Sequence, residues 1–145
     1  MGAVTDDAER AARAQAEAMY AVDRASQALG ITVSEVAVGR ATATMRVRDD
    51  MVNGHDIAHG GYVFLLADTA FAFACNTHGP ATVARSADIT FLSPVTAGEA
   101  LVAVAQERVL SGRNGIYDVT VRRACGEVVA EFRGSSRQLD RRPES

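Results

Sequence analysis

The sequence predicts an α+β protein in which a curved antiparallel β-sheet wraps around one long central helix. Residues 62–75 form a helix-length run that is apolar on all sides, and such a helix is normally buried by other elements. Residues 83–139 consist of short, mostly alternating apolar and polar segments separated by turns, which is typical of antiparallel strands. Because an apolar helix is unfavourable in contact with water, we expect a curved sheet to cover it.

Length and composition indicate one soluble domain. The 145 residues, 48% hydrophobic and 23% charged, are enough for a single core. A formal net charge of −3 without a Lys/Arg block argues against a nucleic-acid partner. The longest apolar run is interrupted by Asp68 and is shorter than the roughly 20 residues that span a bilayer. The acidic N-terminus does not have the pattern of a signal peptide, so we expect a cytoplasmic protein with no membrane partner.

An N-terminal helix and a strand are expected before the central helix. Residues 5–29 lack Gly and Pro and are rich in good helix formers, with Gly30 as a stop. Residues 31–139 are expected to form the core of the domain. Within them, residues 31–47 alternate with a period near two, which is typical of a half-exposed strand, and Gly39 can divide it by a bend or turn.

Four strands are expected after the central helix. They cover residues 83–92, 100–110, 116–123 and 128–139. Residues 100–110 are almost entirely apolar, which fits a strand in the middle of a sheet. The short connections favour hairpins over crossovers. Residues 140–145 are charged and are expected to fray.

The cysteines and histidines provide no metal-binding pattern. Cys75 and Cys125 do not form a CxxC motif, and the three histidines lack zinc spacing. We therefore expect two free thiols in a reducing compartment, no metal ion and no organic cofactor.

The central helix combines a charge and a glycine pair that call for an explanation. Asp68 is the only charged residue in residues 62–75, and burying a carboxylate is costly unless it is paired or has a task. Gly60 and Gly61 stand at the helix entry, where unpaired N–H groups and the macrodipole favour negative charge. They can form an oxyanion site for acyl transfer. Alternatively, the glycines only permit tight packing, and Thr69 or a backbone group satisfies Asp68.

The spacing keeps these two features apart within one chain. At about 1.5 Å per residue, Asp68 lies about 10–12 Å from Gly60 along the helix axis. That distance is too long for both to contact one reacting carbon. Either they serve different tasks, or Asp68 meets Gly60 of a second subunit in a two-fold dimer.

Several motifs, in this order and spacing, resemble the PaaI group of hotdog-fold acyl-CoA thioesterases, the group of phenylacetic acid degradation. They are Asn53-Gly-His55, His59-Gly-Gly61 and residues 67–76, followed by residues 88–94 and 97–99. The resemblance covers about residues 31–139. It implies a hotdog fold, hydrolysis of an acyl-CoA, and a homodimer that assembles into a homotetramer. Ala58, where relatives often have Cys, departs from the pattern but touches no catalytic role.

The resemblance also implies roles for individual residues. The Gly60 N–H would polarise the thioester carbonyl, and Asp68 of the partner subunit would act as nucleophile or general base towards water. Asn53 would help hold that water or the acyl group, and His59 would orient the thioester end. Further candidate contacts to substrate or coenzyme A are Gly61, Thr69, Arg113 and Arg85.

The substrate is expected to be phenylacetyl-CoA, a hydroxylated form, or a related aryl or medium-chain acyl-CoA. Arg113, in a glycine-bearing turn, is the best candidate for a CoA phosphate, followed by Arg85, although either can be a solvated surface charge. Phe64, Phe71 and Phe73 can supply an aromatic wall, but plain core packing is the stronger interpretation.

Two other functions remain open from the sequence. The first is a non-catalytic acyl-CoA-binding sensor, although a sensor has no need of a buried carboxylate at Asp68. The second is a hotdog enoyl-CoA hydratase, because Asp50 and His55 have the Asp-x4-His spacing that resembles those enzymes. The Gly-Asp-x-Asn-Pro context of the hydratases is missing, and His55 can instead be a structural residue of the turn.

Overall fold

The computed structural model describes residues 3–139. Residues 140–145, which are expected to fray, lie outside this range. In chain order the elements are α1 (Ala3–Val22), α2 (Arg24–Ala28), β1 (Thr32–Ala37), β2 (Arg40–Arg46), a 3-10 turn (Asp49–Met51), α3 (Gly60–Cys75), β3 (Thr82–Phe91), β4 (Ala100–Ser111), β5 (Asn114–Arg123) and β6 (Val128–Gln138).

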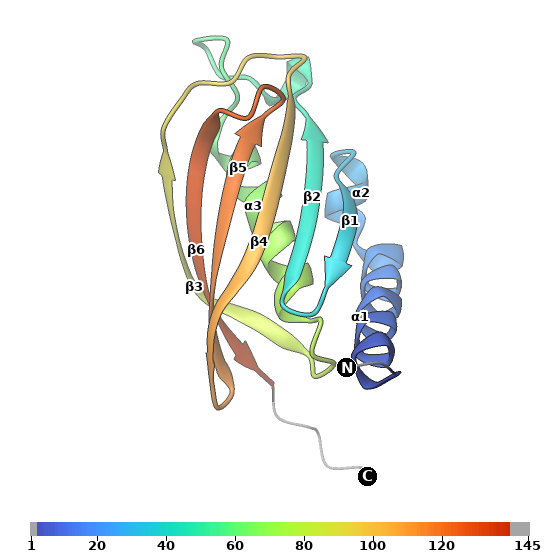
Figure 1. The fold of residues 1–145 in the computed structure, drawn as a ribbon. Coiled ribbons are helices and arrows are strands. Elements are labelled where there is room, and N and C mark those ends of the chain that lie inside the picture. The colour runs from blue at the N-terminus through green and yellow to red at the C-terminus, as the bar shows by residue number, and fades with distance from the viewer. Residues whose placement is uncertain (1–2, 140–145) are drawn as a thin grey trace.

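The described strands form one antiparallel sheet in the order β1-β2-β4-β5-β6-β3, and the sheet curves around α3 (Figure 1). The fold predicted from the sequence, a hotdog arrangement with an additional N-terminal helix, is therefore confirmed. Strand β4 lies between β2 and β5, as its apolar sequence indicated. Phe71 of α3 packs against the sheet, with its ring centroid 5.6 Å from that of Tyr117 and 5.8 Å from that of Phe132.

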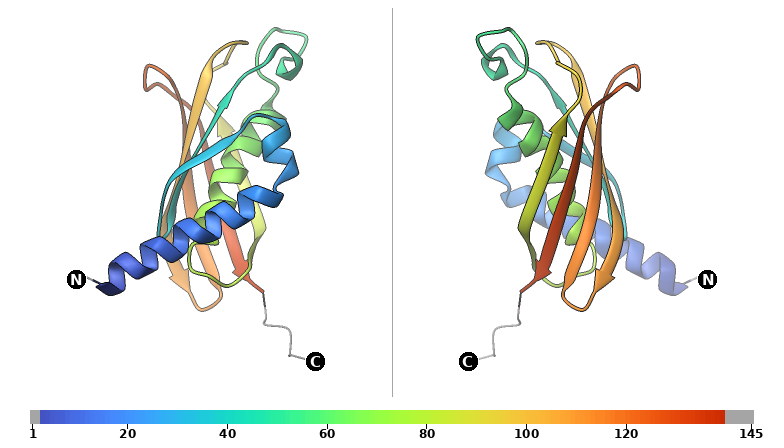
Figure 2. Two further views of the ribbon diagram at one scale, coloured as in Figure 1. Left: turned by 90° about the vertical axis from the view of Figure 1, so that its right-hand side faces the viewer. Right: turned by 90° about the vertical axis from the view of Figure 1, so that its left-hand side faces the viewer.

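The N-terminal helix is divided, contrary to the expectation of one helix over residues 5–29. Asp23 interrupts it and caps α2, because its carboxylate accepts hydrogen bonds from the Ser26 N–H at 3.0 Å and the Ser26 hydroxyl at 2.7 Å. Such local bonds from Asp compete with a continuous helix. Figure 2 shows α1 running diagonally across α3. The ring of Tyr20 on α1 lies 6.5 Å from that of Phe73, centroid to centroid.

The predicted strand over residues 31–47 is two strands, β1 and β2, joined by a turn at Gly39, which has φ 75°. Glycine adopts a positive φ of this kind readily. The division at Gly39 that the sequence allowed is therefore observed as a turn.

The expectation of hairpins is correct for β4, β5 and β6 but wrong for β3. Strand β3 pairs with β6 at the far edge of the sheet, so residues 92–99 must cross from this edge to the central strand β4. We call residues 92–99 the crossing segment. Its backbone is fixed by Leu92 N–H donating to Val129 O, Ala58 N–H donating to Val95 O, and Gly98 N–H donating to Val47 O. Figure 1 shows it beside the loop that leads into α3.

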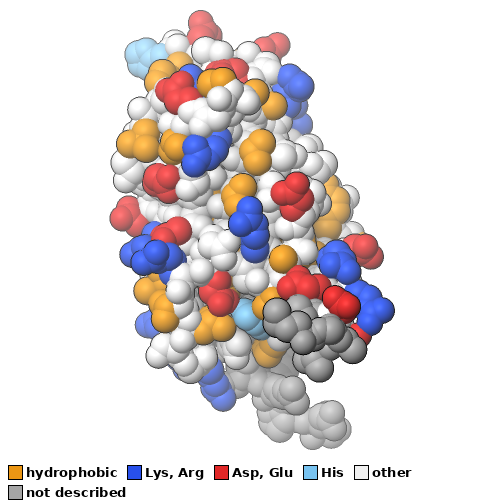
Figure 3. All heavy atoms as spheres, viewed as in Figure 1, with side chains coloured by type: hydrophobic (Ala, Val, Ile, Leu, Met, Phe, Trp, Pro, Cys, Tyr) orange, Lys and Arg blue, Asp and Glu red, His pale blue; other side chains and the backbone are white. Residues whose placement is uncertain are grey.

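The outer face of the sheet carries charges of both signs close together (Figure 3). Asp118 on β5 lies between Arg108 and Arg133, and its carboxylate accepts a hydrogen bond from Arg133 Nε at 2.7 Å. This bond holds the pKa of Asp118 below its usual value. Within residues 3–139, no helix has both the length and the hydropathy needed to cross a membrane.

Candidate active site at the N-terminus of the central helix

A cleft of about 310 Å³ lies where the N-terminus of α3, the end of β3 and the crossing segment meet. Its walls are mostly apolar, with two polar side chains. The lining residues are Asn53, Ile57, Ala58, Gly60, Val63, Phe91, Ser93, Val95 and Val129. Apolar clefts with a few placed polar groups are typical of small-molecule sites.

His59 caps α3 and thereby distinguishes the two glycines at its entry. The His59 Nδ1 atom accepts a hydrogen bond from Gly61 N–H at 3.1 Å, so this nitrogen carries no proton. The Gly60 N–H has no acceptor within residues 3–139. Of the two predicted donors, Gly60 is thus the one whose N–H remains available to an acceptor from outside the described residues, and it lies at the positive end of the helix dipole.

Asn53 is held in place by the turn that precedes α3. Its side-chain oxygen accepts hydrogen bonds from His55 N–H at 2.9 Å and from Ile57 N–H at 3.4 Å. This leaves the Nδ2 donors of Asn53, which have no acceptor in the described part of the chain, available at the cleft. His55 contributes its backbone to the turn, as the structural interpretation expected.

Asp68 is half-buried on α3, and its carboxylate has no hydrogen-bond or ion-pair partner among residues 3–139. Burial raises the pKa of Asp68 above its ordinary value of 3.8. The Thr69 hydroxyl does not satisfy this carboxylate, because it donates to Leu65 O at 2.9 Å and lies 3.2 Å from Ser26 Oγ on α2. Within one chain, therefore, the acid in the apolar helix remains uncompensated.

The predicted phosphate-binding arginines lie away from the cleft in the single chain. Arg85 Nη1 donates to Asn114 Oδ1 at 3.0 Å, and Arg137 Nη1 donates to the same oxygen at 3.3 Å. Arg113 belongs to the turn between β4 and β5, at the opposite end of the sheet from the loop before α3 (Figure 1). The three arginines thus gather around one turn.

The residue pair expected for a hydratase is engaged elsewhere. Asp50 forms an exposed ion pair with Arg48, with Nε to Oδ1 at 3.0 Å. No bond joins Asp50 to His55 within the described residues.

A thiol nucleophile is also disfavoured. Both cysteines are free, and burial raises the pKa of the Cys75 thiol to about 12. At neutral pH this thiol stays protonated, and the thiolate is the reactive form.

The aromatic side chain that lines the cleft was not among the three phenylalanines considered from the sequence. Phe71 and Phe73 are buried in the core, and Phe64 packs on Phe132 with ring centroids 5.4 Å apart. Phe91, at the end of β3, lines the cleft instead. The position of Phe91 within residues 88–94 could have suggested this, but the pairing of β3 with β6 is what brings it to Gly60.

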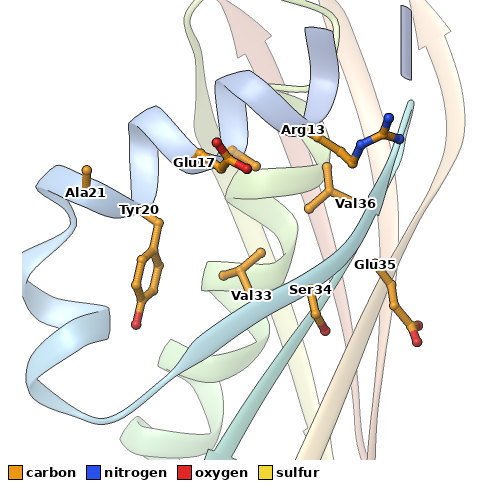
Figure 4. Close-up of a pocket in the computed structure, with 9 residues that line it drawn as sticks. Arg13, Glu17, Tyr20, Ala21, Val33, Ser34, Glu35 and Val36 are labelled. Atoms are coloured by element: carbon orange, nitrogen blue, oxygen red, sulfur yellow. The ribbon is translucent and has the colours of Figure 1, made fainter. Parts of the chain in front are cut away.

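A second hollow, of about 370 Å³, lies between α1 and β1 (Figure 4). Arg13, Glu17 and Tyr20 face it from α1, and Val33 and Val36 from β1. It lies at the opposite edge of the sheet from β3 and contains none of the predicted site residues.

Comparison with known proteins identifies one family. The model of the Thioesterase superfamily matches residues 55–130, which include Gly60 and Asp68. The chain is 45% identical over 124 residues to acyl-coenzyme A thioesterase PaaI of Escherichia coli (strain K12), covering 86% of this chain and 89% of that protein.

Solved structures agree with this family in both fold and sequence. The E. coli PaaI protein from the phenylacetic acid degradation operon superposes with a TM-score of 0.89 and 43% identity over 91% of this chain and 96% of that chain. A mutant of the phenylacetic acid degradation protein PaaI from Thermus thermophilus gives a TM-score of 0.78 at 41% identity, covering 81% and 100%.

Proposed function

Because this chain belongs to the thioesterase superfamily, we propose that it hydrolyses acyl-CoA thioesters at sites shared between two subunits. The proposed substrates are phenylacetyl-CoA, a hydroxylated form, or a related aryl or medium-chain acyl-CoA. The name of the E. coli relative supports the acyl-CoA class, and the apolar lining of the cleft supports an apolar acyl group.

One observation carries the proposal. In the described part of each chain, the Gly60 N–H has no acceptor and the half-buried Asp68 carboxylate has no partner, and the two lie about 12 Å apart along α3. A single chain cannot apply both to one carbon. Two chains related by a two-fold axis can, and they then form two equivalent sites.

The edge strand β3 supports such a dimer. Most of its residues are exposed, and β6 occupies only one of its two edges. An open edge of this length is a template for pairing with another strand. If β3 pairs antiparallel with β3 of a second chain, Arg85 of the partner subunit approaches the end of β3 that carries Phe91. Arg85 and Arg113 of the partner would then bind the phosphates of coenzyme A.

The proposed assembly is a homotetramer, in which two such dimers pair again.

The chemistry follows from these positions. The Gly60 N–H donates to the thioester oxygen and stabilises the negative charge that develops there, an interaction typically worth about 3–4 kcal/mol in the transition state. Asp68 of the partner subunit takes a proton from a water molecule as its oxygen attacks the carbonyl carbon. The C–S bond then breaks, and Asp68 returns the proton to the CoA thiolate. The Asn53 amide holds the water or the acyl group, and His59 keeps the helix entry in position.

Asp68 could instead attack the carbonyl carbon itself, giving an acyl-enzyme anhydride that water then cleaves. Both routes need the ionised carboxylate. A single turnover in H₂¹⁸O distinguishes them, because only the covalent route leaves ¹⁸O in the enzyme when the water attacks the carboxyl carbon of Asp68.

The direct test is release of free thiol from a panel of acyl-CoAs. We expect release with aryl-acyl-CoA substrates well above the rate of spontaneous hydrolysis. Tight binding of every acyl-CoA without thiol release would instead identify a sensor. Addition of water to an enoyl-CoA without thiol release would identify a hydratase.

A further inference from the structure

Phe91 differs from the other four phenylalanines of the chain in its surroundings. The sequence contains five phenylalanines, and four of them take part in ring contacts of the packed interior, namely Phe64, Phe71, Phe73 and Phe132. Phe91 is 52% exposed and lines the cleft. A large apolar side chain left half-exposed in a cleft is available to contact a ligand.

The ring of Phe91 lies directly against Gly60. A methyl group built on Gly60 would lie 2.8 Å from Phe91 Cζ and 3.2 Å from Cε2, closer than side-chain carbons approach one another. The ring therefore covers the helix entry beside the open N–H donor. An acyl group whose carbonyl oxygen reaches this N–H must pass next to the ring.

The backbone fixes the direction of the Phe91 side chain. Phe91 pairs with Ala130 on β6, and Ala130 is fully buried on the inner face of the sheet. Opposed residues of an antiparallel pair share a face, so Phe91 also points inward. Leu92, the next residue, donates its N–H to Val129 O, which anchors the strand end. The register thus directs the Phe91 side chain toward the cleft, where part of the ring stays exposed.

We infer that Phe91 is a specificity-determining residue: its ring forms the wall of the acyl pocket beside Gly60 and favours compact, flat aromatic acyl groups. This inference rests on the proposed thioester hydrolysis. Aromatic rings attract one another edge-to-face or offset, beyond the effect of buried area. Val63 and Val95 line the same cleft as Phe91, and a flat acyl ring can stack on or meet the Phe91 ring edge-to-face in a way that a puckered ring of equal carbon count cannot.

The test compares phenylacetyl-CoA with cyclohexylacetyl-CoA, which has the same carbon skeleton but no planar ring. The measured quantity is the ratio of the two kcat/KM values from thiol release. Phe91→Leu keeps an apolar side chain of similar size, and we expect the preference for phenylacetyl-CoA to fall about threefold or more. Phe91→Ala also removes the wall, and we expect kcat/KM for naphthylacetyl-CoA to rise about tenfold relative to phenylacetyl-CoA.

Leu92→Ala is the matched control, because Leu92 is 58% exposed on the same strand end but does not line the cleft. It is expected to leave the ratio unchanged. If Phe91→Leu loses activity equally on both substrates and retains the wild-type ratio, the inference is overturned. Phe91 would then only pack against α3 and have no part in substrate choice. Because the readout is a ratio, weaker folding or dimerisation affects both substrates alike. The proposed function fails separately, through absence of thiol release by the wild-type protein.

Discussion

Asp68 combines two properties that rarely occur together, substantial burial and no hydrogen-bond or ion-pair partner among residues 3–139. Desolvation raises its pKa, so the carboxylate binds protons more readily than an exposed aspartate does. A base with a raised pKa removes a proton from water more effectively at neutral pH. The same desolvation weakens the fold, because the charged form is less stable in the interior than in the unfolded chain.

Asp68→Asn tests both consequences in one variant. We expect turnover to fall at least about 100-fold, as is typical for loss of a general base, while acyl-CoA binding remains. In the wild type, activity should fall at acidic pH through a pKa above 3.8, because protonation removes the base. Near-normal turnover of the variant would remove Asp68 from the mechanism. Glu17→Gln, which neutralises an exposed carboxylate outside the cleft, serves as control.

The stability of Asp68→Asn should change in the opposite direction. A carboxyl group whose folded pKa is raised contributes stability below its unfolded pKa and loses that contribution as pH rises through the folded pKa. At pH 7 the variant should therefore melt at a higher temperature than the wild type. The difference should disappear as pH falls below the unfolded pKa, where the wild-type side chain is protonated in both states.

The elements of the core were predictable from their sequence patterns, but the pairing of β3 was not. Alternating or apolar segments mark β3 to β6 within a few residues, since side chains on a strand alternate between the two faces. Strands β1 and β2 were expected as one strand with a possible division at Gly39. The residues of the crossing segment are equally compatible with a hairpin and with a path to another strand. Long-range pairing with β6 decides between them, and nothing local in residues 92–99 encodes it.

Some residues of the candidate site were predictable from the sequence, and others were not. Gly60 and Asp68 were singled out by their chemistry and spacing, Asn53 was added by the resemblance to the PaaI group, and that resemblance is confirmed. Phe91 and Val129 reach the cleft only through the β3–β6 pairing. Their place could not be deduced from patterns along the chain.

Gly134 on strand β6 lies so close to the ring of Phe71 that a larger residue does not fit there. A methyl group built on Gly134 would lie 2.7 Å from Phe71 Cζ and 2.8 Å from two further ring atoms, and Phe71 is fully buried. Gly134→Ala should therefore destabilise the protein by about 1–3 kcal/mol, as overpacking of a close-packed core does. Denaturant unfolding at fixed protein concentration measures this.

Gly54→Ala is the comparison for Gly134→Ala. Gly54 has no atoms within 4 Å of the added methyl group and no positive φ, so its free energy of unfolding should stay within about 0.5 kcal/mol of the wild type. Equal stability of the two variants would contradict the packing of α3 on β6 described above.

For the whole molecule, the proposed dimer makes a quantitative prediction about mixed subunits. Chains with Asp68→Asn and chains with Gly60→Val should each form inactive homodimers. A heterodimer of the two has one intact site, with Gly60 from the first chain and Asp68 from the second, and one site that lacks the carboxylate and in which the valine side chain clashes with Phe91 beside the N–H donor. Co-purification through two different tags should yield about half the activity of a wild-type dimer. No recovery in verified heterodimers would place the whole site within one chain.

The crossing segment also bears on how the protein reaches its active form. It closes one side of the cleft, and its anchor at Leu92 forms only when β3 has paired with β6, about 40 residues further along the chain. Contacts between distant parts of a chain are slow to form, because the intervening loop must lose its freedom first. The central strands β4, β5 and β6 can assemble by local hairpins without it. Phe91 and Val129 meet in the cleft only once this pairing has formed, so a chain that has assembled the central hairpins alone lacks that wall of the cleft.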